Sequence, residues 1–166
     1  EIFLTGLHDR NYFDLRAYRF FVQESRLDTH SLARSKQQPW VLATFDYAKT
    51  LDEAVFGGEL SFDINAQGIY REKLGTTSAS RLPAPQGKTG RFTAETEWRR
   101  SFITLGGLVL TPSLSARGDG IFTNYSAATQ AAISTLGPSD IRSSYQRYMA
   151  TAGLEARWPI LMMTDN

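Results

Sequence analysis

The chain has 166 residues, of which 42% are hydrophobic and 21% charged, a size and balance suited to one folded domain. Its 18 basic and 17 acidic residues give a formal net charge of +1, which argues against a nucleic-acid partner. Without cysteine or a long apolar run, these residues hold no disulfide, thiolate zinc site or membrane-spanning helix, but membrane-spanning strands, which are short and only half apolar, are not excluded.

Alternation of apolar and polar residues predicts seven β-strands. In chain order they cover residues 1–7, 12–23, 40–49, 57–68, 90–100, 102–122 and 147–158. Successive side chains of a strand point to opposite faces, so each strand is expected to carry one apolar and one polar face. Two positions interrupt the apolar face: Arg19, near the far end of the second strand, and Pro112, where we expect a bulge or broken pairing.

The connections between these strands alternate between short and long. Long polar segments cover 24–38, 70–89 and 124–146, and the last contains an Ala-rich run, Ala127–Leu136, that predicts a short helix before Gly137 and Pro138. In an up-and-down meander all three long segments lie at one rim. Aromatic residues gather beside the short turns, as in the girdles of membrane proteins: Tyr12, Phe13, Tyr47, Phe56, Trp98, Phe102 and Trp158.

Nothing in the sequence supplies a helical layer to cover the apolar faces, so we expect lipid to cover them. The predicted fold is all-β, an antiparallel up-and-down meander that forms part of a large transmembrane β-barrel of the bacterial outer membrane. We interpret residues 1–166 as a fragment of that barrel domain, with no complete second domain. Single-chain bacterial barrels have an even number of strands, so further strands are expected to close the ring.

This topology assigns the side chains to two solvents. The residues predicted to face the lumen are polar: Asp14, Arg16, Asp46, Glu59, Asp63, Glu95, Glu97, Arg99, Glu155 and Arg157. The residues predicted to face lipid are apolar: Phe13, Leu15, Val41, Phe45, Leu60, Phe62, Ile64, Leu108, Leu110 and Leu154.

Four segments, taken in order, resemble the LptD family of LPS-assembly proteins, also called organic solvent tolerance proteins. They are NYFDLRAYRF at 11–20, QPWVLATFDY at 38–47, VFGGELSF at 55–62 with IYR at 69–71, and AGLEARWPI at 152–160. The resemblance is to the C-terminal barrel region of the family, and it implies a large barrel that receives lipopolysaccharide and releases it into the outer leaflet. It also implies two kinds of partner, the plug lipoprotein LptE and the periplasmic bridge proteins of lipopolysaccharide transport. The cysteines that form disulfides in some members have no counterpart here.

Two alternatives remain open from the residues alone. One is another outer-membrane barrel, either a porin or a barrel enzyme, and the other is a soluble lipid-binding β-barrel with its apolar residues inside. We predict no enzymatic activity and no cofactor. Glu95 and Glu97 share one strand face, but the flanking arginines favour a charge ladder over an acid–base pair.

Other candidate sites also have simpler interpretations. His8 and His30 fall on opposite rims, which disfavours a metal site or a catalytic triad. The Arg117-Gly118-Asp119 tripeptide is too short to indicate adhesion, and the pairs at 57–58 and 106–107 lack the context of a phosphate-binding loop. Five loop cations are candidates for lipid phosphates at the outer rim, although solvated charges are the default interpretation: Arg71, Lys73, Arg81, Lys88 and Arg142.

Overall fold

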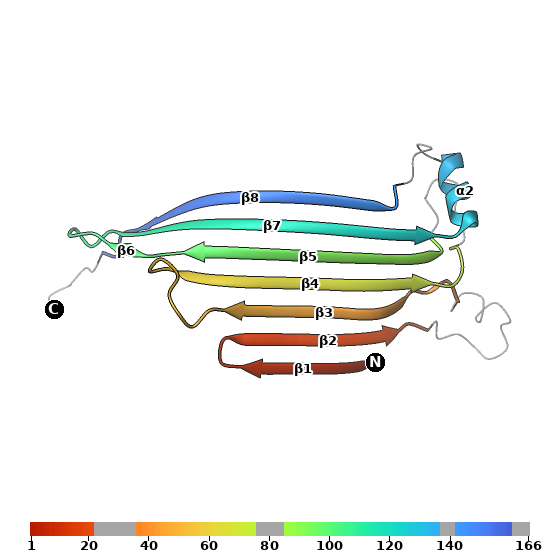
Figure 1. Ribbon diagram of the computed structural model, residues 1–166, viewed down its shortest axis with the longest axis horizontal. Helices are drawn as coiled ribbons and strands as arrows, with labels where there is room; N and C mark the ends of the chain where they lie inside the picture. The colour runs from red at the N-terminus through yellow and green to blue at the C-terminus, as the bar shows by residue number, and fades with distance from the viewer. Residues whose placement is uncertain (22–35, 76–84, 137–141, 161–166) are drawn as a thin grey trace, which may run out of the picture.

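The computed structural model describes residues 1–21, 36–75, 85–136 and 142–160 (Figure 1). The strands are β1 (Ile2–His8), β2 (Asn11–Arg19), β3 (Trp40–Thr50), β4 (Glu59–Arg71), β5 (Gly87–Arg99), β6 (Phe102–Ile103), β7 (Val109–Tyr125) and β8 (Ser144–Arg157). Helix α2 (Ala127–Leu136) lies between β7 and β8 and confirms the predicted helix.

The long strands form one open antiparallel sheet in chain order, β1-β2-β3-β4-β5-β7-β8. The predicted all-β meander is therefore confirmed, and its seven strands correspond to the seven long ones. The two-residue β6 is additional: it folds back so that Phe102 pairs with Leu110 and Ile103 with Val109. The prediction of one continuous strand over 102–122 was therefore wrong at its start.

The cause of that difference is a tight turn at residues 104–107. The Thr104 amide donates to the Leu108 carbonyl at 2.9 Å, and Gly107 adopts a φ of 75°, a backbone conformation that favours glycine. Leu108, predicted to lie on the apolar face of a strand, belongs instead to this connection, because β7 begins at Val109. Apolar residues flank the turn on both sides, so hydrophobic alternation alone does not locate it.

Short and long connections lie at opposite ends of the sheet (Figure 1). The β1–β2, β3–β4 and β5–β7 connections share one end, which we call the turn end. The other three connections share the opposite end, called the loop end, where α2 also lies. Several strands extend farther toward the loop end than predicted: β4 runs to Arg71, and β5 begins at Gly87. Backbone pairing continues there although the alternation of apolar and polar residues does not, so the hydrophobic pattern underestimates strand length.

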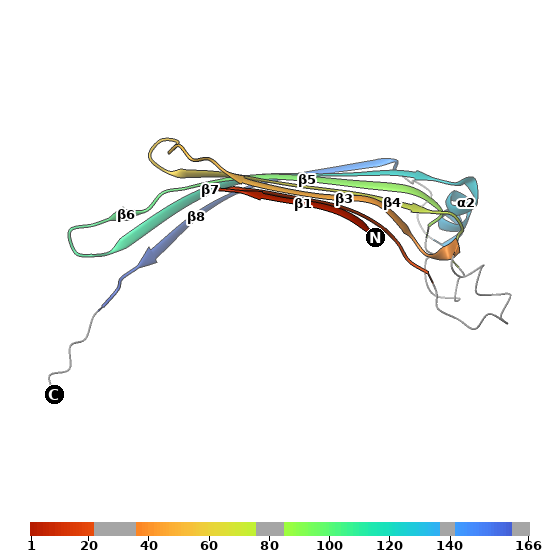
Figure 2. The same ribbon diagram turned by 90° about the horizontal axis from the view of Figure 1, so that it is seen from below.

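The sheet is a single layer (Figure 2). Val41, at 5% exposure, is the only buried hydrophobic residue in the described part of the chain, whereas Leu154 is 70% exposed and Phe92 45%. A soluble sheet of this size would bury one face against a second layer. Among the described elements no such layer exists, so the apolar side chains are left facing the surroundings.

The register of β3 contains a bulge at Leu42. Ala43 pairs with Gly68 and Val41 with Ile69, so Leu42 has no partner on β4. The same residue accounts for the register shift between β2 and β3. An extra residue reverses the faces beyond it. Val41 therefore lies on the face of its partners Tyr18 and Ile69, and the prediction that it shares a face with Phe45 was wrong.

Of the two expectations at Pro112, the bulge is absent, but the strand pairing is interrupted on one side, because β5 pairs with β7 only as far as Ser113 and β6 pairs only from Leu110. The register between β7 and β8 runs without a shift, and Pro112 pairs with Leu154. The Pro112 carbonyl accepts a hydrogen bond from the Arg100 amide at 3.2 Å, so its backbone polar groups face the connection where β5 has ended. The missing N–H of proline therefore removes no ladder bond to β8, which is the kind of position that proline tolerates in a sheet.

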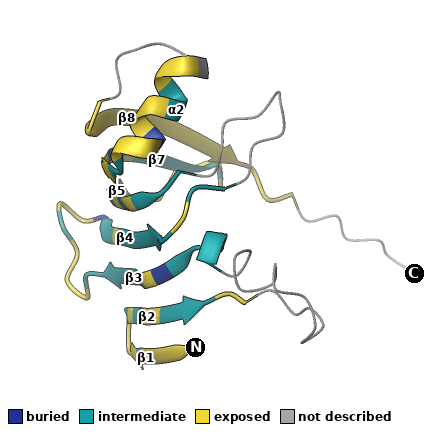
Figure 3. Ribbon diagram, turned by 90° about the vertical axis from the view of Figure 1, so that its right-hand side faces the viewer, coloured by how far each residue is buried: buried dark blue, intermediate teal, exposed yellow. Residues whose placement is uncertain are grey.

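Helix α2 is anchored to the loop end of β5 (Figure 3). Ser126 precedes the helix, and its Oγ accepts a hydrogen bond from the Thr129 amide at 3.3 Å, as an N-cap does. The Thr129 hydroxyl is fully buried, accepts from the Gln86 amide at 2.8 Å and donates to the Gln86 carbonyl at 3.1 Å. Ser126 adds two more bonds, from its amide to the Gln86 carbonyl at 3.1 Å and from its hydroxyl to Gln86 Oε1 at 2.9 Å, so the start of the helix is fastened to the residue just before β5.

Candidate functional site

The strand register sorts the side chains of the sheet into two faces. One row of directly paired positions crosses six strands and is almost wholly polar: Asp14, Asp46, Asn65, Thr93, Asp119 and Arg147. Directly opposite residues in a sheet share a face. We call this side of the sheet the polar face.

The opposite side carries a matching apolar row one position along each strand. It runs through Phe13, Tyr47, Ile64, Ala94, Gly118 and Tyr148. The neighbouring row contains Leu15, Phe45, Ala66 and Phe92. We call this side the apolar face. The separation of the two faces is a property of the whole sheet and not of a single strand.

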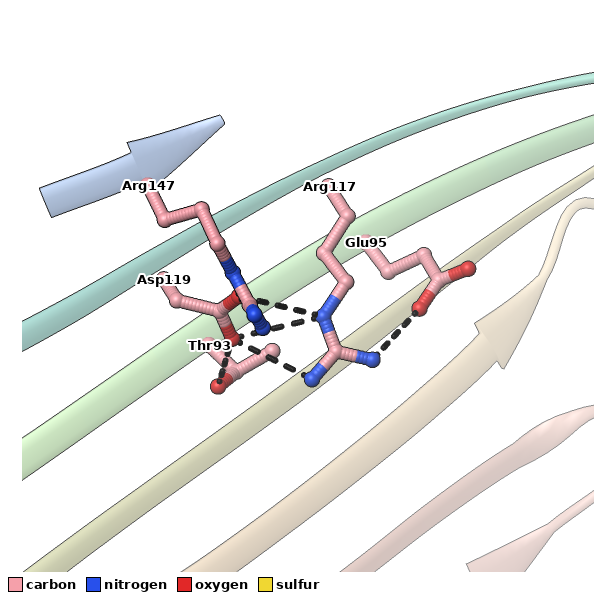
Figure 4. A network of polar contacts seen from close by, with 5 residues as sticks. All are labelled: Thr93, Glu95, Arg117, Asp119 and Arg147. Carbon is pink, nitrogen blue, oxygen red and sulfur yellow. Dashed lines mark hydrogen bonds and ion pairs between the residues drawn. The ribbon is translucent and has the colours of Figure 1, made fainter. Parts of the chain in front are cut away.

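An ion-pair network joins β5, β7 and β8 on the polar face (Figure 4). Arg147 donates to Asp119 at 2.7 Å, Arg117 donates to the same carboxylate at 3.1 Å, and Thr93 adds a hydrogen bond at 2.8 Å. Arg117 also lies 3.5 Å from Glu95. The Asp119 side chain is only 9% exposed, so three donors replace most of its water.

A second carboxylate is held in the same way on β2. Asp14 is 4% exposed and accepts from the Thr5 hydroxyl and from Arg16 Nε, each at 2.5 Å. Farther along the row, Asn65 donates to Asp46. The polar face therefore presents carboxylates whose partners lie within the wall itself, so the wall is ordered before anything binds to it.

A third cluster marks the turn end of the polar face. Glu59 accepts from Arg10 and from Arg99, the latter at 2.7 Å. A hollow beside it is lined by charged residues of both signs, among them Arg100, Glu155 and Arg157. Partly exposed ion pairs of this kind contribute little to stability, but they keep the surface wet and able to exchange partners with a charged ligand.

This arrangement suits binding and passage of polar groups better than covalent chemistry. Arginine side chains supply donors for phosphate or carboxylate, and the aspartates supply acceptors for sugar hydroxyls. Within the described ranges there is no group of three or more His, Cys, Asp or Glu residues that could hold a metal ion.

The register places all ten predicted lumen residues on the polar face. Asp63 pairs with Glu95, Glu59 with Arg99, and Glu97 with Ser61. Eight of the ten predicted lipid-facing residues lie on the apolar face. The two exceptions are Val41, which the Leu42 bulge moves to the polar face, and Leu108, which precedes β7.

The central network itself was missed by the sequence analysis. Asp119 was considered only as part of an adhesion tripeptide, yet Arg117 and Asp119 both lie inside β7 and form an ion pair with each other. Their spacing of two residues on a strand is the signal that places them on one face. Arg147, the first residue of the predicted seventh strand, lies directly opposite Asp119, a relation that only the register reveals.

The remaining candidates are dispersed. Glu97 lies opposite Ser61 and Ser115, whereas Glu95 lies opposite Asp63 and Arg117, so the register surrounds the two carboxylates with different neighbours. His8 ends β1 beside Asp9, while His30 falls outside the described residues.

The loop cations are also separated. Arg71 donates to the Gln37 and Pro85 carbonyls at 2.9 and 3.3 Å, which leaves little of it for a ligand. The Lys73 amide donates to Lys36, and Arg142 accepts a bond from Thr123 at its carbonyl. Arg81 lies outside the described residues. Lys88 is exposed and pairs in register with Tyr70.

Comparison with protein families gives a match over the whole sequence. The family model for LptD, described as LPS transport system D, matches residues 1–166. The chain belongs to the LptD family. LptD proteins act in lipopolysaccharide transport at the outer membrane of Gram-negative bacteria, and this membership decides between the alternatives that the residues left open. The antiparallel sheet is what a section of an LptD β-barrel requires.

Other comparisons add little to the LptD assignment. Comparison with curated proteins and with solved structures gave no match. Among the described helices, none is long and apolar enough to cross a membrane.

Proposed function

We propose that this chain forms part of the wall of an LptD barrel that delivers lipopolysaccharide to the outer leaflet of the outer membrane. The polar face lines the lumen and the apolar face meets the bilayer. Further strands pair with the free edges of β1 and β8 and complete the ring, because a bilayer supplies no hydrogen bonds to an open edge.

The observation that carries this proposal is the continuous polar row from Asp14 to Arg147, backed by an uncovered apolar face. A lumen that passes a phosphorylated sugar head needs charges of both signs at short intervals. Arg117 and Arg147 around Asp119 provide them in the middle of the wall. Apolar side chains on the reverse side gain free energy only if hydrocarbon covers them.

The polar face also suits protein partners. We infer that the plug lipoprotein LptE contacts this wall from inside the barrel, and that the periplasmic bridge proteins deliver lipopolysaccharide from the turn end. The mixed charges beside Glu59 fit a surface that exchanges partners rather than a sealed interface.

Photocrosslinking in the full-length protein in cells tests this assignment. A photoreactive amino acid at Thr44 or Ser115, both on the polar face, is expected to crosslink to LptE or lipopolysaccharide. The same probe at Phe62, on the apolar face, should crosslink to membrane lipid. Crosslinks to bulk bilayer lipid from Thr44 and Ser115 would refute the assignment of the lumen.

A further inference from the structure

A row of cationic and aromatic residues crosses the apolar face at its loop end. The pairing runs from Arg19 on β2 to Trp40 on β3, then to Tyr70 on β4 and Lys88 on β5. Because each pair is directly opposed in the register, the four side chains lie on one face at one level. We call them the loop-end row.

Arg19 is held within this row by aromatic rings and not by a carboxylate. Its guanidinium carbon lies 3.8 Å from the centroid of the Trp40 ring and 4.6 Å from that of Phe21. Cation–π contacts orient the planar guanidinium and leave its N–H groups free to donate. Both Arg19 Nε and Trp40 Nε1 are shielded from solvent and have no hydrogen-bond partner within the described part of the chain.

Two buried donors side by side without an acceptor are unusual in a folded protein, and they point to a missing group. That group must be an acceptor and, beside the Arg19 guanidinium, an anion. Lys88 lies three strands along the row, about 14 Å away by strand spacing, and adds positive potential to the same level of the face. The loop-end row contains no carboxylate, and neither does the next row along the same face, which runs from Gly68 through Gly90 and Phe122 to Ser144.

That next row also leaves space beside the cations. Gly68 and Gly90 are directly paired, so bare backbone faces outward there. A Cβ built on Gly90 would meet nothing within 4 Å, and one on Gly68 only Leu42 at 3.9 Å. This bare backbone lies immediately toward the turn end from Tyr70 and Lys88, where an acyl chain attached to a bound headgroup would run.

We propose that the loop-end row binds the phosphate of a lipid headgroup in the leaflet around the barrel, with an acyl chain of that lipid lying over Gly68 and Gly90. This inference rests on the proposed function, because it requires the apolar face to meet the bilayer. It differs from transport through the lumen, since the site lies on the opposite face of the wall. Tryptophan and tyrosine are suited to this depth, where hydrocarbon gives way to headgroups.

Lipid-dependent thermal stability of the full-length protein in detergent tests the site. Phosphatidylglycerol is titrated against phosphatidylcholine, which adds no net negative charge, and inorganic phosphate is titrated alone. We expect phosphatidylglycerol to stabilise the wild-type protein at lower concentrations than phosphatidylcholine or inorganic phosphate does. The half-effective concentration should rise about fivefold for Arg19→Gln or Lys88→Gln, following the contribution of about 1 kcal/mol per basic residue near a lipid surface.

Matched variants separate a site from general attraction. Arg91→Gln removes a cation from the same strand as Lys88 but from the opposite face, and should leave the preference for phosphatidylglycerol unchanged. Arg19→Lys keeps the charge but loses the planar fork, and should recover only part of the preference. An equal loss in Arg91→Gln, a retained preference in the Arg19→Gln/Lys88→Gln double variant, or an equal response to inorganic phosphate alone would overturn the inference.

The proposed function is tested separately on the same samples. Nitroxide labels at Phe62 and Ile64 report whether the apolar face meets hydrocarbon. If those labels report lipid and the double variant keeps its preference for phosphatidylglycerol, the inference of a lipid site at the loop-end row is wrong and the proposed function is retained. If they report water, the proposed function itself fails.

Discussion

At the scale of single residues, the polar face is organised around carboxylates that several donors share. Asp119 is the clearest case, with Thr93, Arg117 and Arg147 around one nearly buried side chain. Removing the shared anion would leave two guanidinium groups close together without their counter-charge. The structure therefore assigns Asp119 a larger role in stability than any single arginine of the network.

Asp119→Asn in the full-length protein should lower the thermal unfolding temperature of the barrel by several degrees. Arg147→Gln should have a smaller effect, because Arg147 is 68% exposed and Arg117 continues to neutralise the carboxylate. Heat modifiability on an electrophoretic gel measures both.

The control for this prediction is Glu155→Gln on β8. The Glu155–Arg157 pair has a similar distance, 2.7 Å, but side chains that are 60% and 74% exposed, so its loss should shift the unfolding temperature little. Equal shifts in Asp119→Asn and Glu155→Gln would show that the network around Asp119 has no special weight.

At the scale of the element, α2 is attached to the sheet through Gln86, and the buried Thr129 hydroxyl makes two of the hydrogen bonds to that residue. Thr129→Val keeps the volume of the side chain but leaves the Gln86 amide without its acceptor, whereas the Gln86 carbonyl keeps the bond from the Ser126 amide at 3.1 Å. An unsatisfied buried amide costs about 1–3 kcal/mol, which corresponds to an increase of about 5- to 150-fold in the local opening constant. Hydrogen exchange of amides 127–135 should accelerate accordingly.

Thr135→Val provides the matched control on the same helix. Its hydroxyl donates to the Ala131 carbonyl within α2 and is exposed, so exchange should remain near the wild-type rate. Unchanged exchange in Thr129→Val would mean that α2 is held by other contacts.

Sequence patterns located most elements but not the local irregularities. Strict alternation from Glu59 to Ala66 locates β4 because every residue of this stretch on one face is polar and every residue on the other is apolar. The bulge at Leu42 was not predicted, because the residues around it are apolar and fit the pattern in either register. The turn before β7 was not predicted for a similar reason: Ile103 and Val109, on either side of it, are both apolar and suggest one continuous strand. A pattern of alternating apolar and polar residues does not predict a bulge or a turn that is flanked by apolar residues on both sides.

The candidate site was predictable as a face but not as a network. Alternation places Asp63 and Glu95 on the polar side of their own strands, and the structure shows them directly opposite each other. Contacts such as Arg147 with Asp119 depend on the register between distant segments. Register is fixed by pairing along the whole strand, so it cannot be obtained from either segment alone.

At the scale of the whole molecule, the described sheet has one uncovered apolar face and two free edges. Both features favour association with other chains in water. A chain of residues 1–166 produced alone should sediment as aggregate in buffer without detergent. A monodisperse monomer in the same buffer, measured by analytical ultracentrifugation, would show that residues 1–166 form a hydrophobic core of their own and would contradict this account.

The most direct measurement concerns which solvent each face of β4 meets. Nitroxide labels are placed singly at Leu60, Phe62 and Ile64 and at Ser61 and Asp63 of the full-length protein in membranes. Relaxation by oxygen, which partitions into lipid, should dominate at the first three positions, and relaxation by a water-soluble nickel complex at the other two. The reverse pattern, with Leu60, Phe62 and Ile64 in water or shielded from both reagents, would contradict a barrel wall with hydrocarbon on one side and water on the other.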